Sequence, residues 1–125
     1  MKSLIALLFC ITLFSSFSNA ELTIRISKGV DNPTVISVAP FNYNGVIPLA
    51  ENVSSIIAND LRRSGQFAPI DPSNMLSFPS LPENVVYRDW RLLGSEYLVI
   101  GEISPNGPDG KGYQLVFSLF DVVSQ

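Results

Sequence analysis

The chain has 125 residues, of which 46% are hydrophobic and 15% are charged, and its formal net charge is −3 at pH 7. An acidic chain without a cluster of Lys and Arg is a poor candidate for binding nucleic acid or an anionic membrane. This length suits a single domain that can bury a core without metals or disulfides.

Residues 1–20 have the features of a secretory signal peptide. Lys2 is the only charge, residues 4–14 are apolar, and small residues precede the expected cleavage between Ala20 and Glu21. The alternative is a membrane anchor, but a span needs about 20 apolar residues, roughly twice the length of this stretch. Removing the leader from 125 residues leaves 105, and their formal net charge is −4.

Cysteine usage says little about the compartment. The single cysteine, Cys10, lies inside the leader behind Phe9, whereas a lipidated cysteine follows a small residue and becomes the new N-terminus. The processed chain therefore contains no cysteine, and disulfides cannot confirm export. We expect a bacterial periplasmic protein, because cysteine-free domains are tolerated there.

The segment that follows the leader, ELTIRISKG (residues 21–29), has the alternating pattern of a β-strand. Leu22, Ile24 and Ile26 would face one side, with polar residues between them. Two interpretations remain open. The segment is either a permanent edge strand of the domain or a strand that pairs with another protein.

A strand and a helix are expected next. Residues 34–39 are rich in β-branched side chains and indicate a buried strand, and residues 40–45 should form a loop. Residues 51–65 place Val, Ile and Leu at helical spacing. Glu51 should lie in the first turn, two arginines in the last, and Gly65 should close the helix in the left-handed conformation.

A short edge strand (66–70), a surface loop (71–82) and a second helix (85–94) follow. Residues 96–103 and 113–123 form two apolar strands around a Gly- and Pro-rich turn, which predicts a hairpin. Both faces of the last strand carry apolar residues, so we expect cover on both sides. The order of elements predicts a two-layer α/β domain, with a mixed β-sheet and two helices on one face.

Catalytic chemistry has little support. The processed chain has no His or Cys, which excludes the usual triads and thiol nucleophiles and the common zinc sites. Its two lysines, Lys28 and Lys111, lie in polar stretches where an amine stays protonated. Its acidic side chains are scattered along the sequence, and we interpret them as surface charges. Four of them are candidates for a carboxylate-based hydrolase: Asp60, Asp71, Glu96 and Glu102.

Two further patterns are candidates for ligand sites. Three glycines at 107, 110 and 112 lie in a hairpin turn, whereas a phosphate loop needs a strand-to-helix junction. Trp90 and Tyr97 could stack on a small ligand, although aromatic residues on a helix and a strand usually pack in the core. No metal or cofactor is predicted.

Several stretches resemble the N-terminal part of the TolB family, the periplasmic component of the Tol-Pal system of Gram-negative bacteria. The similarity runs in order along nearly the whole chain. It lies in ELTIRISKGVDNP (21–33), VISVAPF (35–41), IIANDLRRSGQFAPID (56–71), WRLLGSEYLVIGEI (90–103) and YQLVFSLFDV (113–122). The third stretch is the most specific.

The resemblance implies a division into a signal peptide (1–20), a partner-binding segment (21–33) and an α/β domain (34–125). It also implies that a six-bladed β-propeller, absent here, follows the domain.

Family members link the inner-membrane protein TolA to the outer-membrane lipoprotein Pal, in maintaining the outer membrane and in cell division. The implied TolA-binding residues are Glu21, Leu22, Thr23, Ile24, Arg25, Ile26, Ser27, Lys28, Gly29, Val30, Asp31 and Asn32. Pal binding would belong to the propeller. The alternatives are a small secreted hydrolase and a ligand-binding module.

Overall fold

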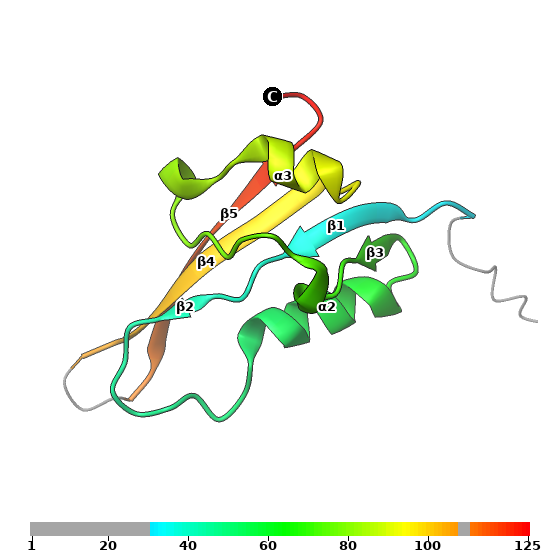
Figure 1. Ribbon diagram of the computed structural model, residues 1–125. Helices are drawn as coiled ribbons and strands as arrows, with labels where there is room; N and C mark the ends of the chain where they lie inside the picture. The colour runs from blue at the N-terminus through cyan, green and yellow to red at the C-terminus, as the bar shows by residue number, and fades with distance from the viewer. Residues whose placement is uncertain (1–30, 108–110) are drawn as a thin grey trace, which may run out of the picture.

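The computed structural model describes residues 31–107 and 111–125 (Figure 1). These residues form one sheet, two α-helices and two 3₁₀-helices. In chain order the elements are β1 (Thr34–Val38), β2 (Asn42–Tyr43), α2 (Val53–Arg63), β3 (Phe67–Pro69), η1 (Pro72–Asn74), η2 (Pro82–Asn84), α3 (Tyr87–Leu92), β4 (Tyr97–Pro105) and β5 (Tyr113–Asp121). The predicted α/β class is confirmed.

The sheet is mixed, as predicted. β1 pairs in parallel with β3 and with β4, and β2 pairs in parallel with the far end of β4. β5 runs antiparallel along the whole of β4, from the Tyr97–Asp121 pair to the Pro105–Tyr113 pair. Since β5 fills one edge of β4, β1 and β2 must share the other edge. Within the described chain, β2, β3 and β5 each pair with a single strand.

Helix α2 begins and ends where local chemistry dictates. The side chain of the N-cap residue Asn52 accepts a hydrogen bond from the backbone N–H of Ser55 at 3.1 Å, so Glu51 lies just outside the helix rather than in its first turn. Arg62 and Arg63 occupy the last turn, next to the negative end of the helix dipole. Gly65 has a φ of 71°, which confirms the predicted left-handed closure.

The two helices lie on opposite faces of the sheet, which corrects the expectation of a shared face. Partly buried residues of α2 pack on Ile36, Val38 and Val99. On α3, Trp90 packs on Leu98 and Ile100, the alternate residues of β4. The reason is chirality. The chain crosses from β1 to β3 in one direction and from β3 to β4 in the other, so right-handed crossovers place α2 and α3 on different sides.

The core on the α3 side contains the largest fully buried side chain. Trp90 is 0% exposed, as are Leu98 and Val122. Two buried hydroxyl groups form hydrogen bonds between β1 and the residues at the start of β4. Ser37 Oγ donates to Ser95 Oγ at 2.9 Å, and Ser95 Oγ donates to the carbonyl oxygen of Tyr97 at 2.7 Å. Both groups are satisfied, so their burial carries no unpaired hydroxyl.

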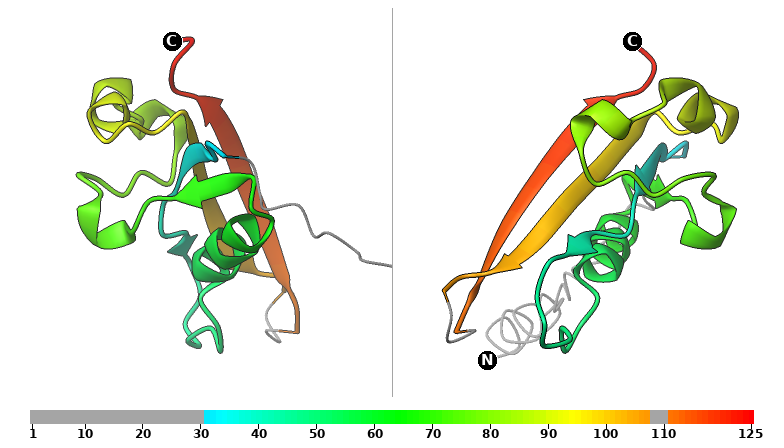
Figure 2. Two further views of the ribbon diagram at one scale, coloured as in Figure 1. Left: turned by 90° about the vertical axis from the view of Figure 1, so that its right-hand side faces the viewer. Right: turned by 60° about the vertical axis from the view of Figure 1, so that its left-hand side comes forward.

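The sequence predicted that β5 is covered on both sides, whereas the structure leaves most of it exposed. Leu115, Phe117 and Leu119 point to the α2 face and are 42%, 64% and 60% exposed, and Val116 on the other face is 59% exposed. The β4–β5 ribbon is long and twisted, and much of it extends past the helices (Figure 2). The predicted hairpin is confirmed, but its second strand is largely open.

Smaller differences concern boundaries. The predicted loop at 40–45 contains the short strand β2, and the second helix is shorter than the predicted range 85–94. The stretch 71–82 contains η1 and reaches the start of η2. It also buries Met75, which is only 8% exposed. A single apolar residue in a Pro- and Ser-rich stretch gives no periodic signal, so this anchor was not predicted.

Gly101 provides a test of how closely the core packs on β4. A Cβ at this position would lie 2.9 Å from a ring carbon of Phe41 and 2.9 Å from the carbonyl oxygen of Val116. We therefore expect Gly101→Ala to lower the free energy of unfolding by about 1–3 kcal/mol, because the β5 backbone must shift. Urea unfolding followed by the fluorescence of Trp90, the only tryptophan, measures this. Ser104→Ala on the same strand is the control, and an equal effect of both changes would contradict the packing argument.

Candidate functional site

The predicted TolA-binding segment lies almost wholly outside the described residues. Glu21 to Val30 fall before the described range, and only Asp31 and Asn32 fall within it. Both residues are exposed and precede β1, whose first residue donates from its backbone N–H to the carbonyl oxygen of Gln66 at 2.9 Å. The described part of the segment is therefore outside the sheet and open to solvent.

The candidate acids do not form a catalytic group. Asp60 pairs with Arg63 on the exposed side of α2, and Asp71 accepts a hydrogen bond from the backbone N–H of Ser73. Just before β4, Glu96 accepts from the backbone N–H of Val35 at 3.2 Å, and within β4 Glu102 accepts from the side-chain amide of Asn42 at 3.3 Å. Each carboxylate thus has a local structural partner. The described chain holds no group of three metal-ligating side chains.

Trp90 and Tyr97 do not form a stacking pair. Trp90 is fully buried against Leu98 and Ile100, whereas Tyr97 packs in the cluster on the opposite face of the sheet. A ligand could not reach the Trp90 ring without opening the core. The ligand-binding alternative, which depended on these two residues together, loses its proposed site.

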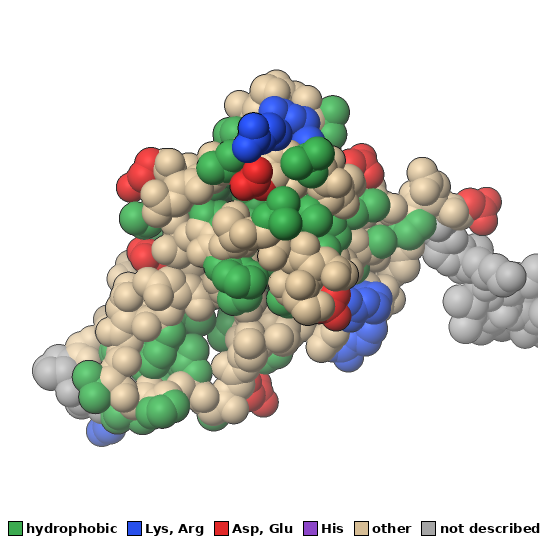
Figure 3. Space-filling view, in the orientation of Figure 1, with side chains coloured by type: hydrophobic (Ala, Val, Ile, Leu, Met, Phe, Trp, Pro, Cys, Tyr) green, Lys and Arg blue, Asp and Glu red, His purple; other side chains and the backbone are tan. Residues whose placement is uncertain are grey.

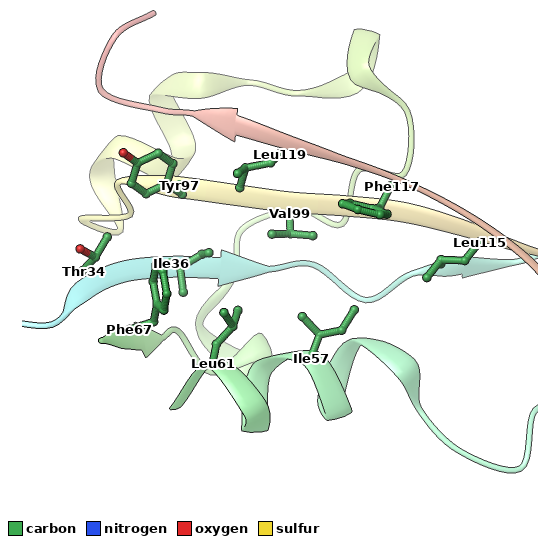
Figure 4. A pocket seen from close by; sticks show the side chains of 10 residues that line it. All are labelled: Thr34, Ile36, Ile57, Leu61, Phe67, Tyr97, Val99, Leu115, Phe117 and Leu119. Atoms are coloured by element: carbon green, nitrogen blue, oxygen red, sulfur yellow. The ribbon is translucent and has the colours of Figure 1, made fainter. Parts of the chain in front are cut away.

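An apolar groove lies between α2 and β5, and sequence reasoning did not predict it. Its cavity volume is about 740 Å³. The side chains that surround it come from α2, β1, β3, β4 and β5 (Figure 4). They are Thr34, Ile36, Ile57, Leu61, Phe67, Tyr97, Val99, Leu115, Phe117 and Leu119. The nearest signal in the sequence was the alternation of apolar residues in β5.

The groove exists because α2 covers only part of its face of the sheet. Ile57 and Leu61 of α2 pack mainly over β1 and β3, which leaves β5 and part of β4 without a helix on that side. No charged side chain lines the groove, so it offers no acid, base or nucleophile. A surface of this kind can hold apolar side chains of another polypeptide, and it is unsuited to catalysis.

Charged residues on the surface are dispersed. On the face shown in Figure 3, the Lys and Arg side chains occur at separate places rather than in one basic patch. This face therefore offers no extended basic surface of the kind that binds nucleic acid. In the described ranges, no helix combines the length and the apolar character that crossing a membrane requires.

Comparison with known proteins decides the family. A family model described as the TolB amino-terminal domain matches residues 22–125. This chain belongs to the TolB amino-terminal domain family. A protein named Tol-Pal system protein TolB from Marinomonas sp. (strain MWYL1) is 46% identical over 126 residues, covering 99% of this chain. A protein of the same name from Pseudomonas syringae pv. syringae (strain B728a) is 40% identical over 108 residues, covering 86% of this chain.

The chain spans about a quarter of the length of these TolB relatives, 28% of the first and 24% of the second. The crystal structure of TolB from Acinetobacter baumannii superposes with a TM-score of 0.60 at 25% identity, over 79% of this chain and 22% of that one. The LpoB C-terminal domain from Salmonella enterica gives a TM-score of 0.53 at 20% identity, over 77% of each chain, and shares the fold alone.

One carboxylate of this TolB-family domain closes the end of the hairpin. Asp121, the last residue of β5, accepts hydrogen bonds from the backbone N–H groups of Val123 and Ser124 at 3.0 Å each, and from the Ser124 hydroxyl at 2.6 Å. The Ser124 hydroxyl bond first, and then the backbone bonds, lower the pKa of Asp121 below its ordinary value.

We expect this carboxylate to make stability depend on acid pH. A lowered pKa in the folded state means that the stabilisation is present above the ordinary Asp pKa of about 3.9 and is lost as the pH falls through the folded-state value. Asp121→Asn should therefore unfold at a lower temperature at neutral pH, and the two proteins should converge once the pH falls below the folded-state pKa of Asp121. Thermal melts across this range measure the effect, with Glu83→Gln as the control. A difference that stays constant with pH would contradict the assignment.

Proposed function

We propose that this chain is the N-terminal domain of a periplasmic adaptor of the Tol-Pal system. The family match over residues 22–125 carries this proposal, together with relatives named Tol-Pal system protein TolB. The domain binds the inner-membrane protein TolA, and a propeller that follows in the complete adaptor binds the lipoprotein Pal. The adaptor thereby serves outer-membrane integrity and invagination during cell division.

The proposed TolA-binding segment is Glu21 to Asn32, and its mode of binding is strand addition. Main-chain N–H and C=O groups supply affinity in this mode, while the alternating Leu22, Ile24 and Ile26 supply selectivity. Two features of the fold support it. Asp31 and Asn32 are exposed and outside the sheet, and β1 already has a strand on each edge, so neither edge of β1 is open to the segment.

The proposed location follows from the leader. Cleavage between Ala20 and Glu21 releases the chain into the periplasm with Glu21 as its first residue. This places the strand-like segment at the free amino end, where it has no preceding chain to restrain it. Mass spectrometry of the exported protein identifies the first residue directly.

A binding role is favoured over the two alternatives by the state of the side chains. A carboxylate-based hydrolase needs two acids on one substrate, and the candidate acids instead hold separate local partners at α2, η1 and the two ends of β4. A ligand module built on Trp90 and Tyr97 needs both rings in one site, and they lie on opposite faces. We therefore propose that the domain is not an enzyme.

Deleting residues 21–32 tests the binding role. We expect loss of binding to the C-terminal domain of TolA, because the deletion removes every donor and acceptor of the added strand. The thermal transition of the domain should stay nearly unchanged, because among the described residues neither core cluster includes one before Ile36. Calorimetric titration and a thermal melt of the same sample measure the two outcomes. Unchanged binding together with a large loss of stability would make the segment structural.

Point variants test whether the segment binds TolA as a pleated strand. In strand addition, Ile24 and Ser27 lie on opposite faces of the segment, so equal charges placed there should differ in effect. Ile24→Asp should weaken TolA binding at least about tenfold, roughly the cost of losing one buried aliphatic side chain, and Ser27→Asp should weaken it much less. Equal losses from the two variants would argue against a pleated strand in the complex.

A further inference from the structure

The loop that leads from β2 to α2 begins with an Asn-Gly pair, Asn44–Gly45. This loop lies at the periphery of the molecule (Figure 1), and the side chain of Asn44 is exposed to solvent. In such a pair, the backbone nitrogen of the glycine can attack the side-chain amide carbon of the asparagine, because glycine has no Cβ to hinder the approach. The pair is therefore a candidate site for a covalent change that needs no enzyme.

The local contacts hold Asn44 in place and leave the attacking nitrogen free. The backbone N–H of Asn44 donates to the carbonyl oxygen of Ile103 at 2.9 Å, which fixes this residue beside β4. Among the described residues, none accepts a hydrogen bond from the backbone N–H of Gly45. No existing hydrogen bond therefore has to break before this nitrogen attacks.

A neighbouring amide is placed to assist the attack. Asn42 Nδ2 donates to Asn44 Oδ1 at 2.9 Å, and the same nitrogen donates to Glu102 Oε1 at 3.3 Å. When a nucleophile adds to the amide carbon of Asn44, negative charge develops on Oδ1. A donor that already points at this oxygen stabilises the tetrahedral intermediate, as the donors of an oxyanion hole do.

Tyr43 gives a structural reason for glycine at position 45. A Cβ at Gly45 would overlap the phenol oxygen of Tyr43. This phenol donates to the carbonyl oxygen of Ile47 at 2.6 Å, and the Tyr43 ring packs edge-on against Tyr113. A larger residue at position 45 would displace the ring from both partners. The packing of the loop therefore favours the residue that makes Asn44 reactive.

We propose that Asn44 is a site of spontaneous deamidation and isomerisation. The bond between the Gly45 nitrogen and Asn44 Cγ forms, the Cγ–Nδ2 bond breaks, and ammonia leaves with the proton of the Gly45 amide. Water then opens the cyclic imide and gives aspartate or isoaspartate, according to which carbonyl–nitrogen bond of the imide breaks. Both products add a negative charge close to Glu102. Isoaspartate also lengthens the main chain by one methylene, which moves Gly45 away from Tyr43.

Peptide mapping by mass spectrometry tests the proposal on the processed chain after incubation at neutral and mildly alkaline pH. We expect the peptide with Asn44 to gain the mass difference between an amide and an acid. The rate should rise with pH, because the attacking nitrogen must lose its proton. Asn74 and Asn84 are exposed and precede Met75 and Val85, so they serve as internal controls and should stay intact. Asn44→Gln should abolish the change at this position, because the longer side chain must close a larger ring.

A second comparison isolates the contribution of the fold. In the folded chain, Asn42→Ala should slow the conversion of Asn44 roughly fivefold, the rate equivalent of one net hydrogen bond. In urea, the variant and the original chain should convert at the same rate. An Asn44 that converts only in urea overturns the proposal, as does conversion confined to the other described Asn-Gly pair, Asn106–Gly107. A folded Asn42→Ala chain that converts at an unchanged or higher rate overturns the role given to the Asn42 donor.

Discussion

The structure depends on β4, which pairs along both edges and carries most of the buried residues of the sheet. β4 has β5 along one edge and β1 and β2 along the other. Its faces are closed as well, with Leu98 and Ile100 buried under α3 and Val99 buried on the α2 side. The apolar residues of β4 at positions 98–100 and 103 are buried, so their burial supplies a large share of the apolar free energy that opposes chain entropy.

Much of the arrangement of strands and helices could be predicted from the amino-acid sequence. The continuous apolar run at 96–103 predicted the strand β4, and the apolar spacing, the charges and Gly65 located α2 within a few residues. The side on which each helix packs could not be predicted, because it follows from strand order. Only when β1 is known to lie between β3 and β4 do the crossovers require opposite faces. The expectation of one shared face failed for this reason.

The candidate site was predictable only in part. The strand-like start at residues 21–27 stands out by its alternation, but a strand of the domain and a strand lent to a partner have the same pattern. The groove left no local signal, because Phe67, Ile57 and Phe117 come from three elements far apart in sequence. Apolar residues on both faces of β5 predicted burial. Periodicity reports which side chains favour burial and cannot report whether a neighbouring element reaches them, and α2 does not reach β5.

A core centred on β4 has a consequence for how such a domain can bind. The described core clusters draw mainly on β1, β4, α2 and α3, while the exposed Asp31 and Asn32 lie outside the sheet. Peripheral backbone can therefore exchange partners without opening the core, because no buried cluster must be broken. The free energy gained from a new strand pair then stabilises the complex, because little unfolding has to accompany it. Residues 21–125 include no histidine or cysteine, and backbone pairing requires neither.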